Sequence, residues 1–453
     1  MKQTPHPRRL NGNERRRRRR RRQAIRYALM ISFLFIACLS VVYLIVNAFW
    51  KQPTVEKTPA SAVSTTSVTT PSSTVETTDS KNGSEQTTST DKEKTASDAT
   101  VKKAKIMASG DILYHDLLYW SAATATGYDF TENFAKIKPL ISSADLALGD
   151  YEGTISDEMP LAGYPLFNAP KEVVPAIKDA GYDVIDLAHN HILDSYLSGA
   201  LNTKKLFEEA GMPTLGVKQS ATDPILVKEV NGIRIAILGF SYGYNGMEAN
   251  LTEEEYATHM QDLDPAKVEA TLKEAEKIAD VTVVMPQIGT EYSLEPTDIQ
   301  KETYHNMIKW GADIIFGGHP HVPEPTEVVE HEGQKKFILY SMGNLISNQR
   351  VETLDNIWTE RGVIMEVNIT KTGDGPVTIE SVDVHPTWVS RTPNGKTSAE
   401  GYELFHYQTL LCEDYIGNGQ YADTLDSETQ QRVESAYYEV EELMAIDPSL
   451  QKK

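Results

Sequence analysis

Side chains of the kinds that bind metal ions follow five short apolar runs. They lie in the strings Gly110-Asp111, Gly149-Asp150-Tyr151-Glu152-Gly153, Ala188-His189-Asn190-His191, Gln287-Ile288-Gly289-Thr290-Glu291-Tyr292 and Gly317-Gly318-His319-Pro320-His321. Each string alone is weak evidence, because Gly-Asp is common in turns and a lone His is more often structural. Together, the carboxylate and amide oxygens and the imidazole nitrogens suit Mn²⁺, Fe or Zn²⁺ rather than a metal that prefers thiolates.

Hydrolysis is the chemistry that such a ligand set supports. A carboxylate that bridges two metal ions about 3.5–4 Å apart would orient a water molecule and neutralise a phosphoryl or carbonyl oxygen. A nearby His that binds no metal can protonate the leaving group. We therefore expect one shared site that holds one or two divalent metal ions.

A largely buried sheet must position these side chains. We predict strands at Ala104–Ser109, Ala144–Leu148, Val184–Ala188, Ile233–Phe240, Val281–Met285, Ile314–Gly317, Phe337–Ser341, Val363–Ile369 and Val377–Val384. Helical spacing marks Thr131–Ser143, Lys171–Ala180, Ser195–Ala210, Pro265–Ala279, Thr303–Gly311 and Ser427–Ala445. Short strands that alternate with helices predict an α/β domain with a mixed sheet. In such a domain, sites collect at the carboxyl ends of the strands.

The five strings, followed by Tyr340-Ser341-Met342-Gly343-Asn344, resemble the ordered motifs of the CapA capsule-synthesis family, from about Lys103 to Thr370. This family is similar to the poly-γ-glutamate synthesis proteins of Gram-positive bacteria and belongs with the calcineurin-like metallophosphoesterases. The resemblance implies a four-layer α/β/β/α sandwich with two packed mixed sheets.

The resemblance also implies roles for individual residues. Metal ligands would be Asp111, Asp150, Glu152, Asn190, His319 and His321, with Asp150 or Glu152 as the bridge. The catalytic proton donor would be His191. Further candidates for the site are His189, Gln287, Glu291 and Asn344.

Two departures from the family pattern affect the expected metal site. Asp150-Tyr151-Glu152 stands where the family usually has Asn before Leu-Glu-Gly, and Gln287-Ile288-Gly289 stands where it often has His-Trp-Gly. Because Gln binds Zn²⁺ or Mn²⁺ more weakly than imidazole does, one metal position is expected to be weak or empty. His189 replaces a common Asn and offers partial compensation. Alternatively, Gln287 forms only a hydrogen bond to a neighbouring loop.

The N-terminal segment predicts a membrane anchor. Residues 28–50 contain no charged side chain and are long enough to cross a bilayer as one helix. The unbroken run Arg15–Arg22 within residues 1–27 places the N-terminus in the cytoplasm, beside anionic lipid, and everything after Trp50 outside. The rival interpretation is a cleaved signal peptide, but this apolar run is longer than a usual signal core.

Composition divides the rest of the chain. Residues 51–100 are rich in Ser and Thr and predict a disordered stalk. We expect a CapA-like, metallophosphoesterase-fold domain at 101–390 and a C-terminal helical extension at 391–453. The net charge of −20 argues against nucleic-acid binding. The two cysteines cannot pair, because Cys38 lies in the predicted anchor and Cys412 lies far downstream.

Three functions fit these expectations. The first is an accessory role in the synthesis or export of an anionic polymer, poly-γ-glutamate or a capsule, at the outer face of the membrane, with membrane-embedded synthase subunits as partners. The second is metal-dependent hydrolysis of an envelope phosphodiester or a polyglutamate amide. The third is polymer binding without catalysis.

Overall fold

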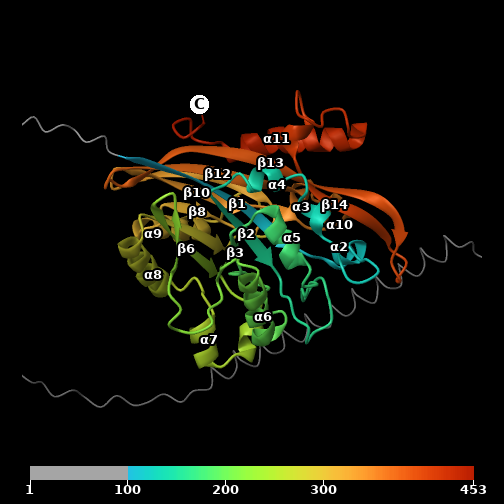
Figure 1. The fold of residues 1–453 in the computed structure, drawn as a ribbon, viewed down its shortest axis with the longest axis horizontal. Helices are drawn as coiled ribbons and strands as arrows, with labels where there is room; N and C mark the ends of the chain where they lie inside the picture. Colours follow the sequence, from blue (N-terminus) through green and yellow to red (C-terminus); the bar gives the residue numbers. More distant parts are fainter. Residues whose placement is uncertain (1–99, 453) are drawn as a thin grey trace, which may run out of the picture. The chain divides into compact units, whose positions relative to one another are not determined.

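Two β-sheets lie face to face in the computed structural model, which describes residues 100–452 (Figure 1). The α/β fold with two mixed sheets that the sequence predicts is confirmed. In the described residues, no helix combines the length and the apolar character that crossing a bilayer requires. The expected cytoplasmic tail, anchor and stalk lie outside these residues, apart from residue 100.

The first sheet has the strand order β14-β13-β12-β1-β2-β3-β4, and β11 pairs with the end of β1. Its strands are β1 (Val101–Leu113), β2 (Leu146–Glu152), β3 (Val184–Asp186), β4 (Thr214–Leu215), β11 (Asn344–Ile346), β12 (Arg361–Thr372), β13 (Val377–Thr397) and β14 (Glu403–Leu411). The strands β1 to β4 are parallel, whereas β12, β13 and β14 follow on the other side as antiparallel neighbours.

The second sheet has the order β5-β6-β7-β8-β10-β9. Its strands are β5 (Leu226–Val230), β6 (Ile233–Ser241), β7 (Val281–Gln287), β8 (Ile314–Phe316), β9 (Pro323–His331) and β10 (Gln334–Met342). The four central strands are parallel, and the edge strands β5 and β9 are antiparallel to their neighbours.

Helices cover the outer face of each sheet. Those packed on the first sheet are α2 (Asp116–Ser121), α3 (Thr131–Phe134), α4 (Lys138–Ile141), α5 (Val173–Ala180) and α6 (Tyr196–Glu209). Those packed on the second are α8 (Pro265–Ile278) and α9 (Asp298–Lys309). The remaining helical segments are η1 (Met247–Asn250), α7 (Glu253–His259), α10 (Val351–Leu354), η2 (Ile357–Glu360), η3 (Cys412–Tyr415) and α11 (Ser427–Met444).

The alternation of side chains along β1 shows how the layers are joined. Met107 packs against the helices of the first sheet, whereas Ile106 and Ala108 on either side of it face the second sheet. This is the two-residue period of a strand that is buried on both faces. In β7, Val283 faces the first sheet and Val284 faces α8 and α9. The layers therefore run helix, sheet, sheet, helix.

The prediction of a single helix at Thr131–Ser143 is wrong. The structure has two short helices there, α3 and α4, joined by a turn. Pro139 lies in this segment, and proline lacks the N–H group that a continuous helix requires. By contrast, α8 begins where expected, since the Asp264 side chain accepts hydrogen bonds from the first turn and Pro265 occupies the first position.

The C-terminal segment contributes both a strand and a helix. The strand β13 runs through residue 390 and pairs with β14. Helix α11 packs on β13, where Val433 and Ala436 contact the group around Trp388 (Figure 1). Met444, at the end of α11, joins the core between the sheets. Residues 391–452 thus continue the first sheet and cover it.

A buried carboxylate in β12 makes the stability of this fold depend on pH. Burial alone would raise the pKa of Glu366, but hydrogen bonds from Asn368, Lys452 and Lys105 lower it to about 2. Because this pKa is lower in the folded than in the unfolded chain, its stabilisation is present above about pH 4.5 and is lost as the pH falls toward 2. In urea denaturation, Glu366→Gln should therefore lower the free energy of unfolding more at about pH 6 than at about pH 3.

The exposed Glu254 of α7 provides the matched control for this prediction. Glu254→Gln should change the free energy of unfolding little at either pH. An equal loss at both pH values in Glu366→Gln would contradict the prediction.

Candidate metal centre

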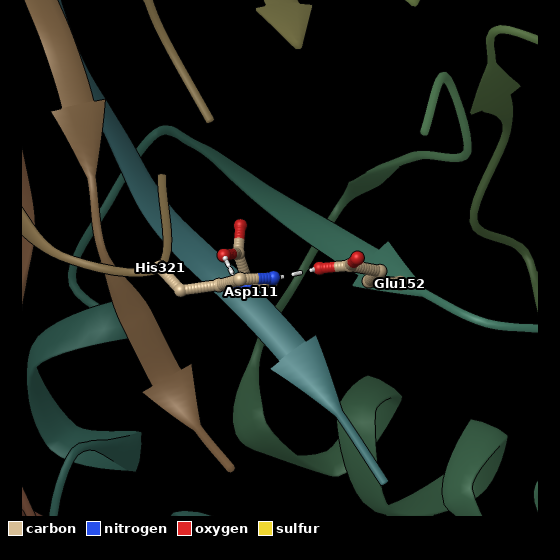
Figure 2. Close-up of side chains that lie close together, drawn as sticks. All are labelled: Asp111, Glu152 and His321. Atoms are coloured by element: carbon tan, nitrogen blue, oxygen red, sulfur yellow. Dashed lines mark hydrogen bonds and ion pairs between the residues drawn. The ribbon is translucent and has the colours of Figure 1, made fainter. Parts of the chain in front are cut away.

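Three of the predicted ligands converge at the carboxyl ends of β1 and β2. Asp111 lies on β1, Glu152 ends β2, and His321 lies in the loop between β8 and β9. One ligand atom from each lies within 4.8 Å of the other two, and all three side chains are buried. Figure 2 shows the His321 imidazole between the two carboxylates, with Nδ1 2.8 Å from Asp111 Oδ2 and 3.7 Å from Glu152 Oε2.

Burial and neighbouring charges shift the pKa values of the side chains at this centre. Burial tends to lower the pKa of His321, but the Glu152 charge and the hydrogen bond to Asp111 outweigh it and raise the pKa to about 10. Burial raises the pKa of Glu152, and the neighbouring His321 only partly offsets this. A bound cation would favour the ionised carboxylates and remove the proton from the imidazole.

Asn344 positions His321. It pairs with Asp111 across the short parallel ladder of β11 and β1. Its side-chain amide donates to the backbone oxygens of His321 and Thr359 and to Gln349 Oε1, and its Oδ1 lies 3.2 Å from His321 Nδ1. These contacts hold the imidazole toward the carboxylates, because they fix both its loop and its ring.

Removing this support should weaken metal binding. We expect Asn344→Ala to lower the affinity for Mn²⁺ about 10- to 100-fold, the usual cost of losing a side chain that orients a ligand. Isothermal titration with Mn²⁺ measures the change. Asn133→Ala is the control, because Asn133 is also buried but bonds to Tyr114 and to the Tyr407 oxygen, neither of which is a candidate residue of the site. Unchanged affinity in Asn344→Ala would contradict this role.

Asp150 lies beside this group. Its Cα pairs with that of Asp111 across β2 and β1, and its Oδ1 is buried without a hydrogen-bond partner. Burial, followed by the charges of Asp111, Asp186 and Glu152, raises the pKa of Asp150 well above its ordinary value. Gly318 approaches so closely that a Cβ there would lie 2.9 Å from Asp150 Oδ2. The absence of a side chain at position 318 therefore leaves space beside this buried carboxylate.

His191 is oriented as a proton donor would be. Its Nδ1 lies 2.7 Å from Asp194 Oδ2, so Asp194 holds the proton on that nitrogen. Its Nε2 faces the centre, 3.9 Å from Glu152 Oε1, and Asn245 lies beside it at 3.4 Å. Burial opposes protonation, but the bond to Asp194 and the Glu152 charge together raise the pKa of His191 above its ordinary value.

The Gln287 side chain bonds to the backbone of Asn190. Gln287 Oε1 accepts a hydrogen bond from the Asn190 N–H at 2.7 Å and a longer one from Ser241 Oγ. This is the bond to a neighbouring loop that was the alternative role for Gln287. The Asn190 Oδ1 atom is buried and has no partner, so it is available to a metal ion.

The other histidines differ in their surroundings. Both ring nitrogens of His189 face backbone N–H groups, those of Gly153 and His191, so this side chain supports the loops instead of facing the carboxylates. His319 has a buried Nδ1 without a partner, and its ring centroid lies 6.2 Å from that of His321. Both His319 and His321 have positive φ angles, of 98° and 58°, a backbone strain that often marks functional loops.

Glu291, the remaining candidate, is exposed in the loop after β7.

The donor set fits a divalent cation. Several buried atoms have no hydrogen-bond partner, namely Asp111 Oδ1, Asp150 Oδ1, both carboxylate oxygens of Glu152, Asn190 Oδ1 and His319 Nδ1. A buried polar atom without a partner costs about 1–3 kcal/mol. Oxygen and imidazole ligands are those that Mn²⁺, Fe and Zn²⁺ accept. Asp111, Glu152 and His321 would hold one ion, and Asp150, Asn190 and His319 remain candidates for further ligands because each has a buried polar atom without a partner.

Two residues at the site were missed from the sequence. Asp194 was overlooked although it follows His191 by three residues, a spacing that allows contact within one turn. His115 is buried, its ring packs on Phe167 at 5.1 Å, and its Nδ1 faces the Asn348 N–H. Burial lowers the pKa of His115 to about 3, with a smaller effect from the His321 charge. No pattern around His115 distinguished it from a core histidine.

Residues 105–349 match the model of the bacterial capsule synthesis protein PGA_cap family, and this segment contains every candidate site residue from Asp111 to Asn344. The chain belongs to the PGA_cap family. The resemblance to CapA proteins is thereby confirmed. The PGA biosynthesis protein CapA of Bacillus subtilis is 29% identical over 56% of this chain and 65% of its own length. The capsule biosynthesis protein CapA of Bacillus anthracis is 31% identical over 48% of this chain and 54% of its own length.

Similarity to solved structures is weak. The NAD nucleotidase NadN of Haemophilus influenzae aligns with 74% of this chain and 62% of its own, with a TM-score of 0.40 and 13% identity. A sulfate thiohydrolase, SoxB, covers 65% of this chain and 43% of its own, with a TM-score of 0.33 and 15% identity.

Proposed function

We propose that this protein is a membrane-anchored accessory protein that acts outside the cytoplasm in the synthesis or export of poly-γ-glutamate or a related capsule polymer. The observation that carries this proposal is the family match, because residues 105–349 include every candidate residue of the metal centre. The names of the two Bacillus relatives support the choice of polymer.

The N-terminal sequence supports the location. The uncharged segment 28–50 after an Arg-rich tail favours one outward-facing span. The tail would contact anionic lipid, and the span would contact membrane-embedded synthase subunits. The Ser/Thr-rich segment that follows would let the folded domain reach polymer away from the bilayer.

Deletion of the gene tests the role. We expect the deletion strain to lose surface polymer, measured by capsule staining and by polymer released from the cell surface. The full-length gene should restore the polymer, whereas a gene for residues 51–453 without the anchor should not. Unchanged polymer in the deletion strain would refute the proposed function.

A second candidate function is metal-dependent hydrolysis of the metallophosphoesterase kind, acting on an envelope phosphodiester or a polyglutamate amide. The observation that favours it is the His191–Asp194 pair aimed at Glu152. A divalent ion held by Asp111, Glu152 and His321 would supply Lewis-acid polarisation of a phosphoryl or carbonyl oxygen. His191 would hold a proton at Nε2 for the leaving group while Asp194 fixes its ring.

Assays of the purified protein with Mn²⁺ on an aryl phosphodiester and on poly-γ-glutamate separate the candidates. Turnover of either substrate that chelation abolishes supports the hydrolase. Polymer binding without turnover instead supports the third role, a binding domain without catalysis.

A further inference from the structure

One loop of the second sheet reaches candidate residues that the first sheet carries. Residues 242–246 follow β6, whereas Asn190 and His191 follow β3. In this loop, Asn245 Oδ1 accepts a hydrogen bond from Asn190 Nδ2 at 3.3 Å, and Asn245 Nδ2 lies 3.4 Å from His191 Nε2. Asn245 therefore contacts both a candidate metal ligand and the candidate proton donor.

Asn190 is held at its backbone and at its side chain by residues of the second sheet and its loops. Its N–H donates to Gln287 Oε1 at 2.7 Å, and its side-chain nitrogen donates to Asn245. Its Oδ1 atom is buried without a partner. Because the oxygen and nitrogen of an amide point in different directions from one carbon, a bond that holds the nitrogen also fixes where the oxygen points. The bond to Asn245 thus leaves the oxygen free to bind a cation.

The loop itself is fixed on both sides of Asn245. The Tyr242 N–H donates to the Gln287 backbone oxygen at 3.0 Å, which ties the start of the loop to the end of β7. Tyr244 is fully buried and packs in the hydrophobic core between the first sheet and its helices. The backbone that carries Asn245 is therefore held by both sheets.

A simpler explanation for Asn245 is the shape of its turn. Asn245 and Gly246 have φ angles of +55° and +79°, and Asn and Gly adopt such left-handed conformations more readily than other residues. Asn231 and Gly232, between β5 and β6, have nearly the same angles, +52° and +79°. The two turns share a backbone geometry, but Asn245 bonds to a candidate ligand and Asn231 bonds to the Lys103 backbone oxygen at the other end of β6.

We infer that Asn245 is a positioning residue of the metal centre, which holds the Asn190 amide with its oxygen free to bind a divalent ion. This inference rests on the metal centre of the proposed hydrolase and is independent of the polymer. Asn245 would act through Asn190 as Asn344, on β11 of the first sheet, acts through His321, in a loop of the second. Each sheet would then orient a ligand that the other sheet carries. The contact with His191 is longer, and this role does not depend on it.

Mn²⁺ titration of the purified full-length protein in detergent tests this role. Asn245→Gly removes the amide but keeps a residue that suits the left-handed backbone, so the unfolding midpoint of the metal-free protein should change little. The affinity of one Mn²⁺ binding step should fall about tenfold, within the usual cost of losing a side chain that orients a ligand. Asn245→Asp keeps an acceptor for the Asn190 nitrogen and should retain the affinity.

A double variant shows whether Asn245 acts through Asn190. Asn190→Ala should lower the same affinity at least as much as Asn245→Gly does. Adding Asn245→Gly to Asn190→Ala should cause no further loss, whereas two independent effects would multiply. Asn231→Gly is the matched control, because its turn has the same backbone geometry, and it should leave the affinity unchanged.

The inference alone is overturned if the native protein binds Mn²⁺ and Asn245→Gly binds it equally well. It is also overturned if the loss persists in the Asn190→Ala background, or if Asn245→Asp or Asn231→Gly shows the same loss. A native protein that binds no Mn²⁺ overturns the inference together with the proposed hydrolase. Unchanged polymer in the deletion strain refutes the accessory role and leaves the result for Asn245 intact.

Discussion

Glu152→Gln should lower the affinity for Mn²⁺ at least about a hundredfold, more than the loss of a side chain that only orients a ligand. Glu152 is buried, and neither of its carboxylate oxygens has a hydrogen-bond partner. The amide has the same shape but carries no charge, so the variant removes the attraction for a cation without opening a cavity. Elemental analysis and Mn²⁺ titration measure the loss.

Thermal unfolding gives an independent readout. A ligand that binds only the folded state stabilises it by about 2.7 kcal/mol at a concentration about 100 times its Kd. Mn²⁺ should therefore raise the unfolding midpoint of the native protein but not that of Glu152→Gln. Glu324→Gln is the control, because Glu324 is equally buried but bonds to Gln300 outside the ligand cluster. If Mn²⁺ still raised the unfolding midpoint of Glu152→Gln, Glu152 would not be a metal ligand.

His191→Ala should lower kcat about 10²- to 10⁴-fold in any hydrolysis that this site performs, since that is the usual contribution of a positioned proton donor. The affinity for Mn²⁺ should stay unchanged, because Nε2 lies 3.9 Å from Glu152 and the ring bonds to Asp194 through its other nitrogen. Steady-state kinetics combined with metal titration separates this role from that of a ligand.

Two further variants sharpen this test. Asp194→Asn should also lower kcat, because an amide no longer holds the proton on Nδ1 of His191. His305→Ala is the control, since His305 is partly exposed and pairs with Glu327 on the surface. Full activity in His191→Ala, or an equal loss in His305→Ala, would contradict the assignment.

The parts of the fold that could be predicted are those in which local pattern and tertiary environment agree. Within β6 and β7 the segments 235–240 and 283–286 are apolar on both faces, and such an apolar run marks a buried strand. The position of the site could be predicted from the buried strands, because parallel strands bring their carboxyl ends to one edge of a sheet. Asp111 and Asp150 meet in this way as direct neighbours on β1 and β2.

Other elements gave no comparable signal. The edge strands β5 and β9 have half-buried, polar sequences, and β14 alternates too irregularly to be separated from a loop. Each pairs with the strand next to it in the chain, β6, β10 or β13, and its structure comes from that pairing and not from an apolar pattern of its own. The direction in which a side chain points could not be predicted from the sequence either. His189 and His191 are two residues apart, yet one faces backbone amides and the other faces Glu152.

The pairing of β11 with the tip of β1 determines when the centre can form during synthesis of the chain. Asp111 and His321 are 210 residues apart, and Asn344, which holds His321, lies beyond both. Most of the folded domain must therefore be available before the ligands meet, and contacts of such long range form slowly. Metal acquisition would then be a late event in biogenesis, after the polypeptide has reached the compartment in which it folds. The metal supply of that compartment would decide which ion the protein carries.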